Sequence, residues 1–146
     1  TKSIIYSVNE LYATVSVLFF DGKKIKQLQE LSLTDTGFSG KNGAADIHIS
    51  ADGKFLYASN RGDANTISTF KVNKKSLLEK IAVQSTLGKT PRNFSLDPSG
   101  NFLLVANQNS DEIVVFNRNK TTGLLSDSGT RIKVGSPSCI QFLRFH

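Results

Sequence analysis

The sequence of 146 residues holds a single cysteine, Cys139. One thiol cannot form a disulfide within the chain, and no CxxC pair exists that could bind a metal or carry out redox chemistry. We therefore expect a reducing compartment, which places the protein in the cytoplasm. From its place in the repeat described below, Cys139 itself is expected to be a small buried residue.

Other signals of chemistry are missing as well. No group of His, Cys, Asp or Glu residues has metal-ligand spacing, and the sequence has neither a glycine-rich phosphate loop nor a Gly-x-Ser-x-Gly nucleophile motif. The sequence therefore predicts no bound metal and no cofactor. His146, the last residue, is expected to be disordered rather than functional.

Long apolar runs and continuous basic stretches are also absent. No apolar stretch approaches the roughly 20 residues that a membrane-spanning helix needs, and the first residues lack the pattern of a signal peptide. The formal net charge of +6 favours anionic ligands. The lysines are scattered over apparent turns, however, and form no basic stripe interleaved with aromatic residues. We expect neither a nucleic acid nor a membrane as a partner.

What the sequence does contain is an internal repeat. The segment Asp46–Asn60 recurs as Asn93–Asn107, 47 positions further along, and both the apolar character and the turn residues repeat. Each copy continues into a second alternating run, Thr66–Val72 in one and Glu112–Asn117 in the other. Self-similarity at a period between about 20 and 50 residues indicates a repeat architecture.

The runs within each unit have the character of strands. They are short, alternate with period two and are rich in Ile, Val, Phe and Tyr, which is typical of half-buried strands. Glycines in Asp52–Gly53 and Ser99–Gly100 supply the positive φ that tight hairpins need. About four strands are expected per unit, and helix content should be small. The sequence thus predicts an all-β fold built of four-stranded β-propeller blades.

The predicted blades do not suffice for a closed ring. We expect one partial propeller domain over residues 1–146, with repeat units at roughly 1–42, 43–88 and 89–134 and the start of another at 135–146. Propellers close with about four to eight blades. About three blades would leave apolar faces open, and either missing blades or self-association would have to cover them. We favour a part of a larger ring.

Two segments resemble a known family. Gly43–Arg61 and Thr90–Gln108 are similar to the lactonase family of seven-bladed β-propellers, which includes bacterial 6-phosphogluconolactonases of the propeller type and fungal carboxy-muconate cyclases. Asp46–His48, Ser59–Arg61 and Pro91–Phe94 are the more specific groupings. The similarity extends over essentially the whole chain and implies the C-terminal two-fifths or so of a family member. Two further matching groups are Asn9–Leu11 and Gly135–Pro137.

Comparison of the repeats also suggests where a site lies. One asparagine follows the same apolar strand in each unit, and these residues are predicted to satisfy backbone groups at the turn: Asn9, Asn60 and Asn107. The residue after each asparagine differs, being Glu10, Arg61 or Gln108. All three are expected to project near one rim of the central channel. A carboxylate, a guanidinium and an amide at one rim would suit a small anionic substrate.

Two further candidates lie on the strands before these turns. His48 alternates with Ile47 and Ile49 and therefore points to the opposite face. From the residues alone a buried, hydrogen-bonded histidine is favoured, whereas the family resemblance favours a catalytic one. Arg92 is either a surface arginine paired with a carboxylate or a ligand for a substrate anion, and the resemblance favours the second interpretation.

The resemblance implies a hydrolase that opens a sugar lactone, most concretely 6-phosphogluconolactone of the pentose phosphate pathway. Glu10 or His48 would act as general base toward water, while Arg61 and Arg92 bind the anionic group and stabilise the oxyanion, and Gln108 binds substrate. The alternatives are a lactone-forming cyclase of the muconate type and a non-catalytic binding scaffold. Enzyme activity is expected of a full-length protein, since absent blades would finish the cleft.

Overall fold

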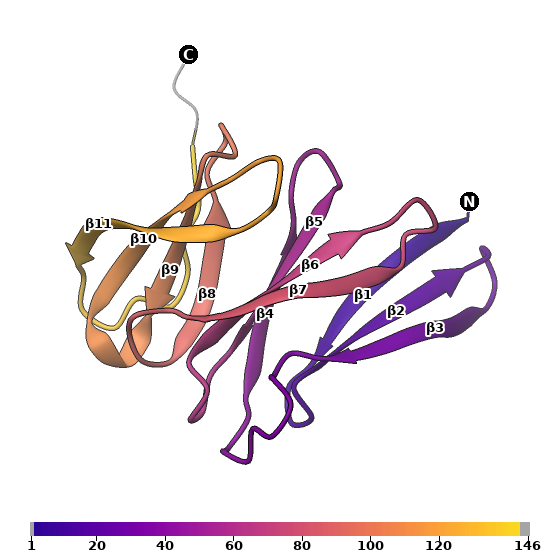
Figure 1. Ribbon diagram of the computed structural model, residues 1–146, viewed down its shortest axis with the longest axis horizontal. Helices are drawn as coiled ribbons and strands as arrows, with labels where there is room; N and C mark the ends of the chain where they lie inside the picture. Colours follow the sequence, from indigo (N-terminus) through magenta and orange to yellow (C-terminus); the bar gives the residue numbers. More distant parts are fainter. Residues whose placement is uncertain (1, 144–146) are drawn as a thin grey trace.

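The computed structural model describes residues 2–143 and is almost entirely β-structure (Figure 1). His146 lies outside the described residues. Within residues 2–143 the strands form three antiparallel sheets that fan out side by side, and the one helical element is a 3-10 turn at Gln108–Ser110. The predicted all-β propeller architecture is confirmed. No helix within residues 2–143 is long and apolar enough to cross a membrane.

Each sheet lies within one repeat unit, and its strands follow one another in space as in sequence. The first sheet has the order β1 (Ser3–Asn9), β2 (Thr14–Phe20) and β3 (Ile25–Ser32). The second consists of β4 (Ala44–Ile49), β5 (Phe55–Asn60), β6 (Thr66–Val72) and β7 (Leu78–Ser85). The third consists of β8 (Pro91–Leu96), β9 (Phe102–Asn107), β10 (Glu112–Arg118) and β11 (Leu125–Lys133).

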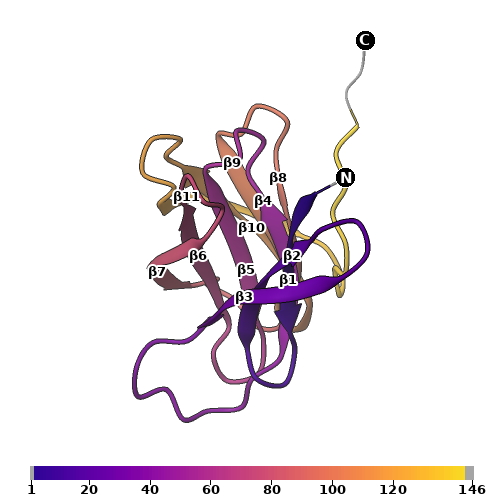
Figure 2. The same cartoon turned by 90° about the vertical axis from the view of Figure 1, so that its right-hand side faces the viewer.

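The first sheet has three strands where about four were expected. The pairing register shows why, because Asn9 pairs with Thr14 just as Asn60 pairs with Thr66. Strand β1 is therefore the equivalent of β5, and within residues 2–143 the first sheet has no counterpart of β4. Figure 2 looks onto this sheet, and no strand of the described part of the chain lies in front of its outer face.

Apolar side chains fill the two junctions between neighbouring sheets. Alternation along β2 and β5 sends Val15, Val17 and Leu56 into the junction of the first and second sheets. Phe55 and Phe94 belong to the cluster between the second and third sheets. Because both faces of the second sheet are covered, strand β5 is buried along its whole length. Face-to-face packing of twisted sheets is the arrangement of propeller blades.

A tyrosine at the same place in β1 and β5 clamps each sheet to the next one. The Tyr6 hydroxyl donates a hydrogen bond to the Ser76 carbonyl (2.9 Å), and the Tyr57 hydroxyl donates one to the Gly123 carbonyl (2.7 Å). Burial raises the pKa of the Tyr57 hydroxyl. Each clamp joins a strand to the turn before the outermost strand of the following sheet, so it fixes the angle between two sheets.

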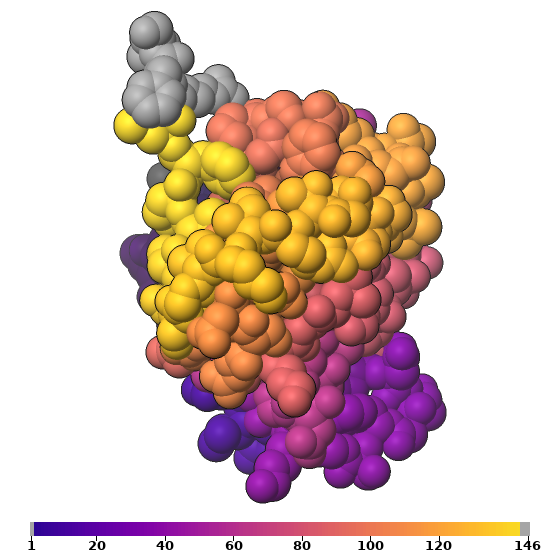
Figure 3. All heavy atoms as spheres, turned by 90° about the vertical axis from the view of Figure 1, so that its left-hand side faces the viewer, coloured from indigo at the N-terminus to yellow at the C-terminus, as the bar shows by residue number. Residues whose placement is uncertain are grey.

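Residues 135–143 run alongside the third sheet and form a ridge at its margin (Figure 3). The Ile140 amide donates a hydrogen bond to Asn93 Oδ1 (2.7 Å), which holds this segment beside β8. The expectation that Cys139 is buried is wrong, because its side chain is exposed. Within the described residues this segment is not part of a sheet, so no neighbouring strand covers the thiol.

Candidate functional site

A hollow of about 230 Å³ lies where strands of all three sheets end or begin. Glu10 follows β1, Arg61 follows β5, and Arg92 is the second residue of β8. These three residues line the hollow together with Ala44 and Ala45 at the start of β4. The small side chains of the two alanines leave the space that the charged groups surround.

Backbone hydrogen bonds hold the first two charged residues at this rim. The Ala44 amide donates to the Glu10 carbonyl (3.0 Å), and the Arg61 amide donates to the Gly43 carbonyl (3.0 Å). Asn60 Oδ1 accepts from the Gly43 amide (3.0 Å), so this asparagine has the structural role predicted for it. The chain is thereby fixed on both sides of the start of β4.

Arg61 and Glu10 form an ion pair inside the hollow. Arg61 Nη2 lies 2.5 Å from Glu10 Oε1, and Arg61 Nε donates to the Gly43 carbonyl at 3.0 Å. The arginine side chain is 21% exposed and the glutamate side chain 62% exposed. The guanidinium is therefore held in one orientation, while the carboxylate keeps access to solvent.

Arg92 is the unpaired cation of the hollow. Within residues 2–143 its guanidinium has no hydrogen bond or ion pair, and its side chain is exposed. One carboxylate and two guanidiniums leave the hollow with one net positive charge. Arginine presents two parallel N–H donors to a carboxylate or a phosphate. The arrangement can therefore bind a small anion beside a solvent-accessible carboxylate.

Gln108 occupies the equivalent rim position of the third sheet. Its main-chain amide donates to the Thr90 carbonyl (3.0 Å), as the main-chain amide of Arg61 does to the Gly43 carbonyl. Asn107 Nδ2 donates to the Thr86 carbonyl (3.0 Å), which gives this asparagine a structural role as well. Gln108 lies at the predicted end of its sheet, but it is not among the residues that line the hollow.

His48 lies apart from the other candidates and does not line this hollow, so its catalytic role stays a prediction. It stands three residues beyond Ala45 on β4, which at about 3.3 Å per residue separates the two by about 10 Å. His48 lines a second hollow of about 330 Å³, together with Ser95 and Arg118. The sequence pattern does not reveal this separation, because period-two alternation shows which face of the sheet a side chain is on but not how far along the strand it lies.

Asp46 is the partner of His48 and was missed as a site residue. His48 Nε2 lies 3.1 Å from Asp46 Oδ2, and that oxygen also accepts hydrogen bonds from Asn93 Nδ2 (2.6 Å) and the Phe94 amide (3.1 Å). The imidazole meets the Phe94 ring edge to face at 4.9 Å. This cluster joins β4 to β8, and the pairing of Asp46 with Asn93 in the repeat was a signal that could have revealed it.

The environment of Asp46 favours its ionised form. Burial of the carboxyl by itself would raise its pKa, but hydrogen bonds from His48 and the Phe94 amide outweigh burial and hold the pKa below its ordinary value. An ionised Asp46 keeps His48 oriented and accepts from the neighbouring sheet. Within residues 2–143 no set of three or more His, Cys, Asp or Glu side chains is placed to hold a metal ion.

Comparison with known proteins identifies relatives over nearly the whole chain. The sequence pattern of the family described as "Lactonase, 7-bladed beta-propeller" matches residues 1–142. A 6-phosphogluconolactonase of Formosa agariphila is 42% identical over 145 residues, which cover 96% of this chain and 40% of that protein. A 6-phosphogluconolactonase of Bacillus subtilis is 32% identical and is matched over 94% of this chain and 40% of its own length.

Solved structures agree with the sequence relatives. The periplasmic gluconolactonase of Pseudomonas aeruginosa superposes with a TM-score of 0.88 at 42% identity, covering 91% of this chain and 37% of that protein. A protein from Lactobacillus plantarum superposes with a TM-score of 0.91 at 35% identity, covering 97% and 42%.

The chain therefore spans about two-fifths of the length of its relatives, 40% in the case of the Formosa protein. This fraction agrees with the share implied by the resemblance, while the placement of that share at the C-terminal end of a family member stays a prediction. A match over residues 1–142, at sequence identities well above those of chance, leaves no other assignment for the fold family. The chain belongs to the lactonase family of seven-bladed β-propellers.

Proposed function

We propose that this chain is part of a lactone hydrolase that opens a sugar lactone, with 6-phosphogluconolactone as substrate. The observation that carries the proposal is the unpaired Arg92 beside the Glu10–Arg61 ion pair in one hollow. Relatives named 6-phosphogluconolactonase support the substrate class. A phosphorylated sugar lactone offers an anionic group for Arg92 and a carbonyl beside it.

In the proposed reaction Arg92 binds the phosphate of the substrate through two N–H donors. Glu10 takes a proton from a water molecule, and the water oxygen attacks the lactone carbonyl carbon. Arg61 faces the developing oxyanion and stabilises it. The bond between the carbonyl carbon and the ring oxygen then breaks, and the proton held by Glu10 passes to that oxygen, which yields the open hydroxy acid.

We assign His48 a different role from that of a base in this hollow. Its contacts with Asp46 and Phe94 support a role in holding β4 against β8. Gln108 is proposed to contact the part of the substrate that extends toward the third sheet, since it stands at the same rim. Substitution of His48 and of Gln108, measured in the same hydrolysis assay as the variants described below, tests both assignments.

The partners proposed beyond the substrate are further blades. Beside the outer face of the first sheet, Leu11 and Tyr12 in the turn between β1 and β2 are 80% and 81% exposed, and Ile25 at the start of β3 is 61% exposed. Exposed apolar side chains of this size at a sheet margin support contact with another sheet. We propose that missing blades of the ring cover this face, with self-association as the alternative. The cytoplasm remains the proposed compartment, although one similar structure is that of a periplasmic protein.

The decisive experiment measures hydrolysis of 6-phosphogluconolactone by the longest natural form of the protein that contains this chain. Arg92→Ala is expected to raise KM about 10- to 100-fold, because a charge-assisted hydrogen bond is worth roughly 1.5–3 kcal/mol. The matched control is Arg131→Ala, because Arg131 pairs with Asp127 on the outermost strand β11, away from the hollow.

Equal KM values for the Arg92 and Arg131 variants would show that the hollow does not bind the substrate. Absence of hydrolysis by the unmodified protein, with phosphate still bound, would indicate a binding scaffold instead of a hydrolase.

A further inference from the structure

We propose that Asn65 positions Arg92 relative to Arg61, so that one amide side chain sets the spacing of the two cations in the hollow. This inference rests on the proposed function, because it concerns how the same hollow holds an anion. Asn65 lies in the turn between β5 and β6 and lines no part of the hollow itself. It is therefore a positioning residue rather than a catalytic one.

The two ends of the Asn65 side chain hold the two segments that carry the arginines. Asn65 Nδ2 donates a hydrogen bond to the Gly62 carbonyl (3.1 Å), and Gly62 directly follows Arg61. Asn65 Oδ1 accepts a hydrogen bond from the Thr90 amide (2.7 Å), and Thr90 precedes Arg92 by two residues. The carboxamide thus bridges the end of β5 and the start of β8, which belong to different sheets.

The main chain of Asn65 strengthens the same connection. Its carbonyl accepts hydrogen bonds from the Thr86 amide (2.9 Å) and the Thr86 hydroxyl (3.0 Å). The segment from Thr86 to Thr90 is therefore attached to Asn65 at both of its ends. This segment leads directly into Pro91 and Arg92, so its position fixes where the Arg92 side chain begins.

Thr90 has a backbone conformation that needs such support. Its φ is 57°, which is unusual for a β-branched residue and is further disfavoured before a proline. The main-chain amide of Gln108 donates to the Thr90 carbonyl (3.0 Å), and the Thr90 amide donates to Asn65 Oδ1. With both polar groups of this peptide segment occupied, the unfavourable conformation persists and directs β8 toward the hollow.

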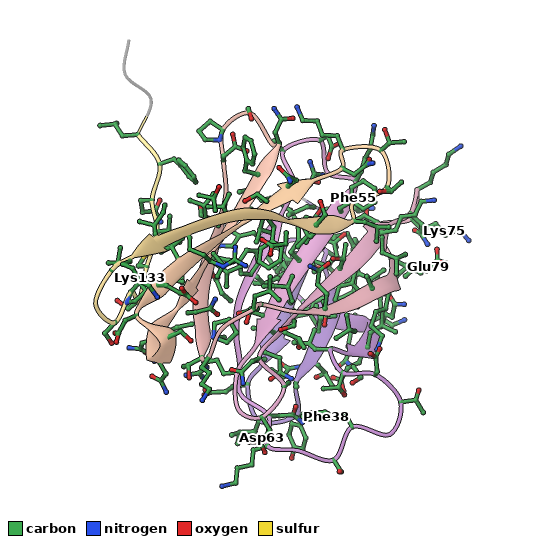
Figure 4. All side chains as sticks on the ribbon, turned by 60° about the vertical axis from the view of Figure 1, so that its left-hand side comes forward. Phe38, Phe55, Asp63, Lys75, Glu79 and Lys133 are labelled. Atoms are coloured by element: carbon green, nitrogen blue, oxygen red, sulfur yellow. The ribbon has the colours of Figure 1, made fainter. Side chains whose placement is uncertain are left out.

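The segment that follows Arg61, to which Asn65 Nδ2 donates, is held firmly in place. Gly62 has φ of +67°, and a Cβ at this position would lie 2.2 Å from the Lys41 carbonyl oxygen. Asp63 binds Lys41 in both directions, with its amide donating to the Lys41 carbonyl (2.9 Å) and its carboxylate accepting from the Lys41 amide (2.7 Å). Figure 4 shows Asp63 beside Phe38 in this part of the molecule. Asn65 therefore ties Arg92 to a segment that cannot shift easily.

The other repeats supply a natural comparison. Ala13 and Asp111 occupy the place of Asn65 in the first and third sheets, and both also have positive φ, 46° and 51°. Asp111 Oδ1 accepts from the Ser136 amide (2.8 Å), which repeats the bond from Thr90 to Asn65. In that copy a serine, Ser138, stands where Arg92 would be. Asp111→Ala thus removes the same kind of bond from a place that positions no arginine of the hollow.

The test compares Asn65→Ala with Asp111→Ala in the longest natural form of the protein. Asn65→Ala is expected to raise KM for 6-phosphogluconolactone and the dissociation constant for inorganic phosphate about tenfold, while Asp111→Ala changes both less than twofold. In the Arg92→Ala background, Asn65→Ala should have less than a twofold further effect on KM, because no Arg92 side chain remains to be positioned.

Equal effects of Asn65→Ala and Asp111→Ala on KM would overturn the inference, and so would a full tenfold effect of Asn65→Ala without Arg92. The urea midpoints of the two single variants show whether both lose similar stability, so that a difference in KM is not a difference in folding. An unmodified protein that does not hydrolyse the lactone would contradict the proposed function instead, and the phosphate titration would then still test the role of Asn65.

Discussion

Replacing Tyr57 by phenylalanine tests how much one buried hydroxyl contributes to the stacking of two sheets. Tyr57 has no exposed surface, and its hydroxyl both donates to the Gly123 carbonyl (2.7 Å) and accepts from Arg118 Nε (2.7 Å). The Arg118 side chain is 3% exposed and lies over the Phe55 and Tyr57 rings at 5.6 and 5.7 Å. Tyr57→Phe removes the hydroxyl, so the buried Gly123 carbonyl loses a donor and the buried Arg118 guanidinium loses an acceptor.

The expected loss follows from these two bonds. A buried neutral group left without a partner costs about 1 kcal/mol or more, and a hydrogen bond to a charged group is worth roughly 1.5–3 kcal/mol. We therefore expect the free energy of unfolding to fall by about 3 kcal/mol. Arg118 retains its bond to the Gly100 carbonyl (3.0 Å), and the nearest carboxylate, Asp52, lies 3.9 Å away, so neither replaces the lost hydroxyl.

Tyr6→Phe is the matched control, because Tyr6 occupies the same place in the first sheet and makes a single bond, to the Ser76 carbonyl (2.9 Å). Among residues 2–143 no cation interacts with its half-buried hydroxyl, so a loss of about 1 kcal/mol is expected. Urea unfolding followed by circular dichroism measures both variants, with an unchanged m-value as the check that the transition is comparable. A loss for Tyr57→Phe no larger than that for Tyr6→Phe would refute the reasoning about Arg118.

Two further predictions concern the junctions around the hollow. The pKa of Asp46 is lowered in the fold, so the stability it contributes is present above its ordinary value and is lost as pH falls through the folded pKa. Between pH 6 and pH 3 the urea midpoint should therefore fall more for the unmodified chain than for Asp46→Asn, and equal falls would contradict this. Gly62→Ala is expected to cost at least about 2 kcal/mol, because its Cβ would lie 2.2 Å from the Lys41 carbonyl oxygen at a φ of +67°. Gly129→Ala, which has positive φ but open space around the Cβ, is its control in urea unfolding, and a similar loss in both would refute the steric explanation.

The sequence was sufficient to predict the sheets and the rim of the hollow. Period-two alternation in β5 and the turn glycine Gly53 are local signals, and the 47-residue repeat aligned Asn60 with Asn107. Because equivalent strands end at the same rim, Glu10 and Arg61 could be expected to approach one another. Their ion pair at 2.5 Å agrees with that expectation.

The sequence could not predict how far along its strand a residue lies, or which turn residues have an unusual backbone conformation. His48 and Ala45 lie close together in sequence but face hollows at different ends of β4, since an extended chain advances about 3.3 Å per residue. The repeat comparison did not predict a role for Asn65, because the residues at the equivalent positions of the other sheets, Ala13 and Asp111, are of different types. What these three positions share is a positive φ, which residue type reveals only weakly outside glycine.

The hollow draws one charged residue from each sheet, and this explains why contacts outside it decide its chemistry. Glu10, Arg61 and Arg92 belong to the first, second and third sheets in turn. No hydrogen bond within residues 2–143 joins Arg92 directly to the other two, so its distance from them depends on how the third sheet stacks on the second. Asn65 fixes that junction at the rim of the hollow, whereas Tyr57 fixes it at the turn before the outermost strand. A loosened junction would therefore weaken anion binding while leaving the Glu10–Arg61 pair intact, because the first and second sheets have a separate core.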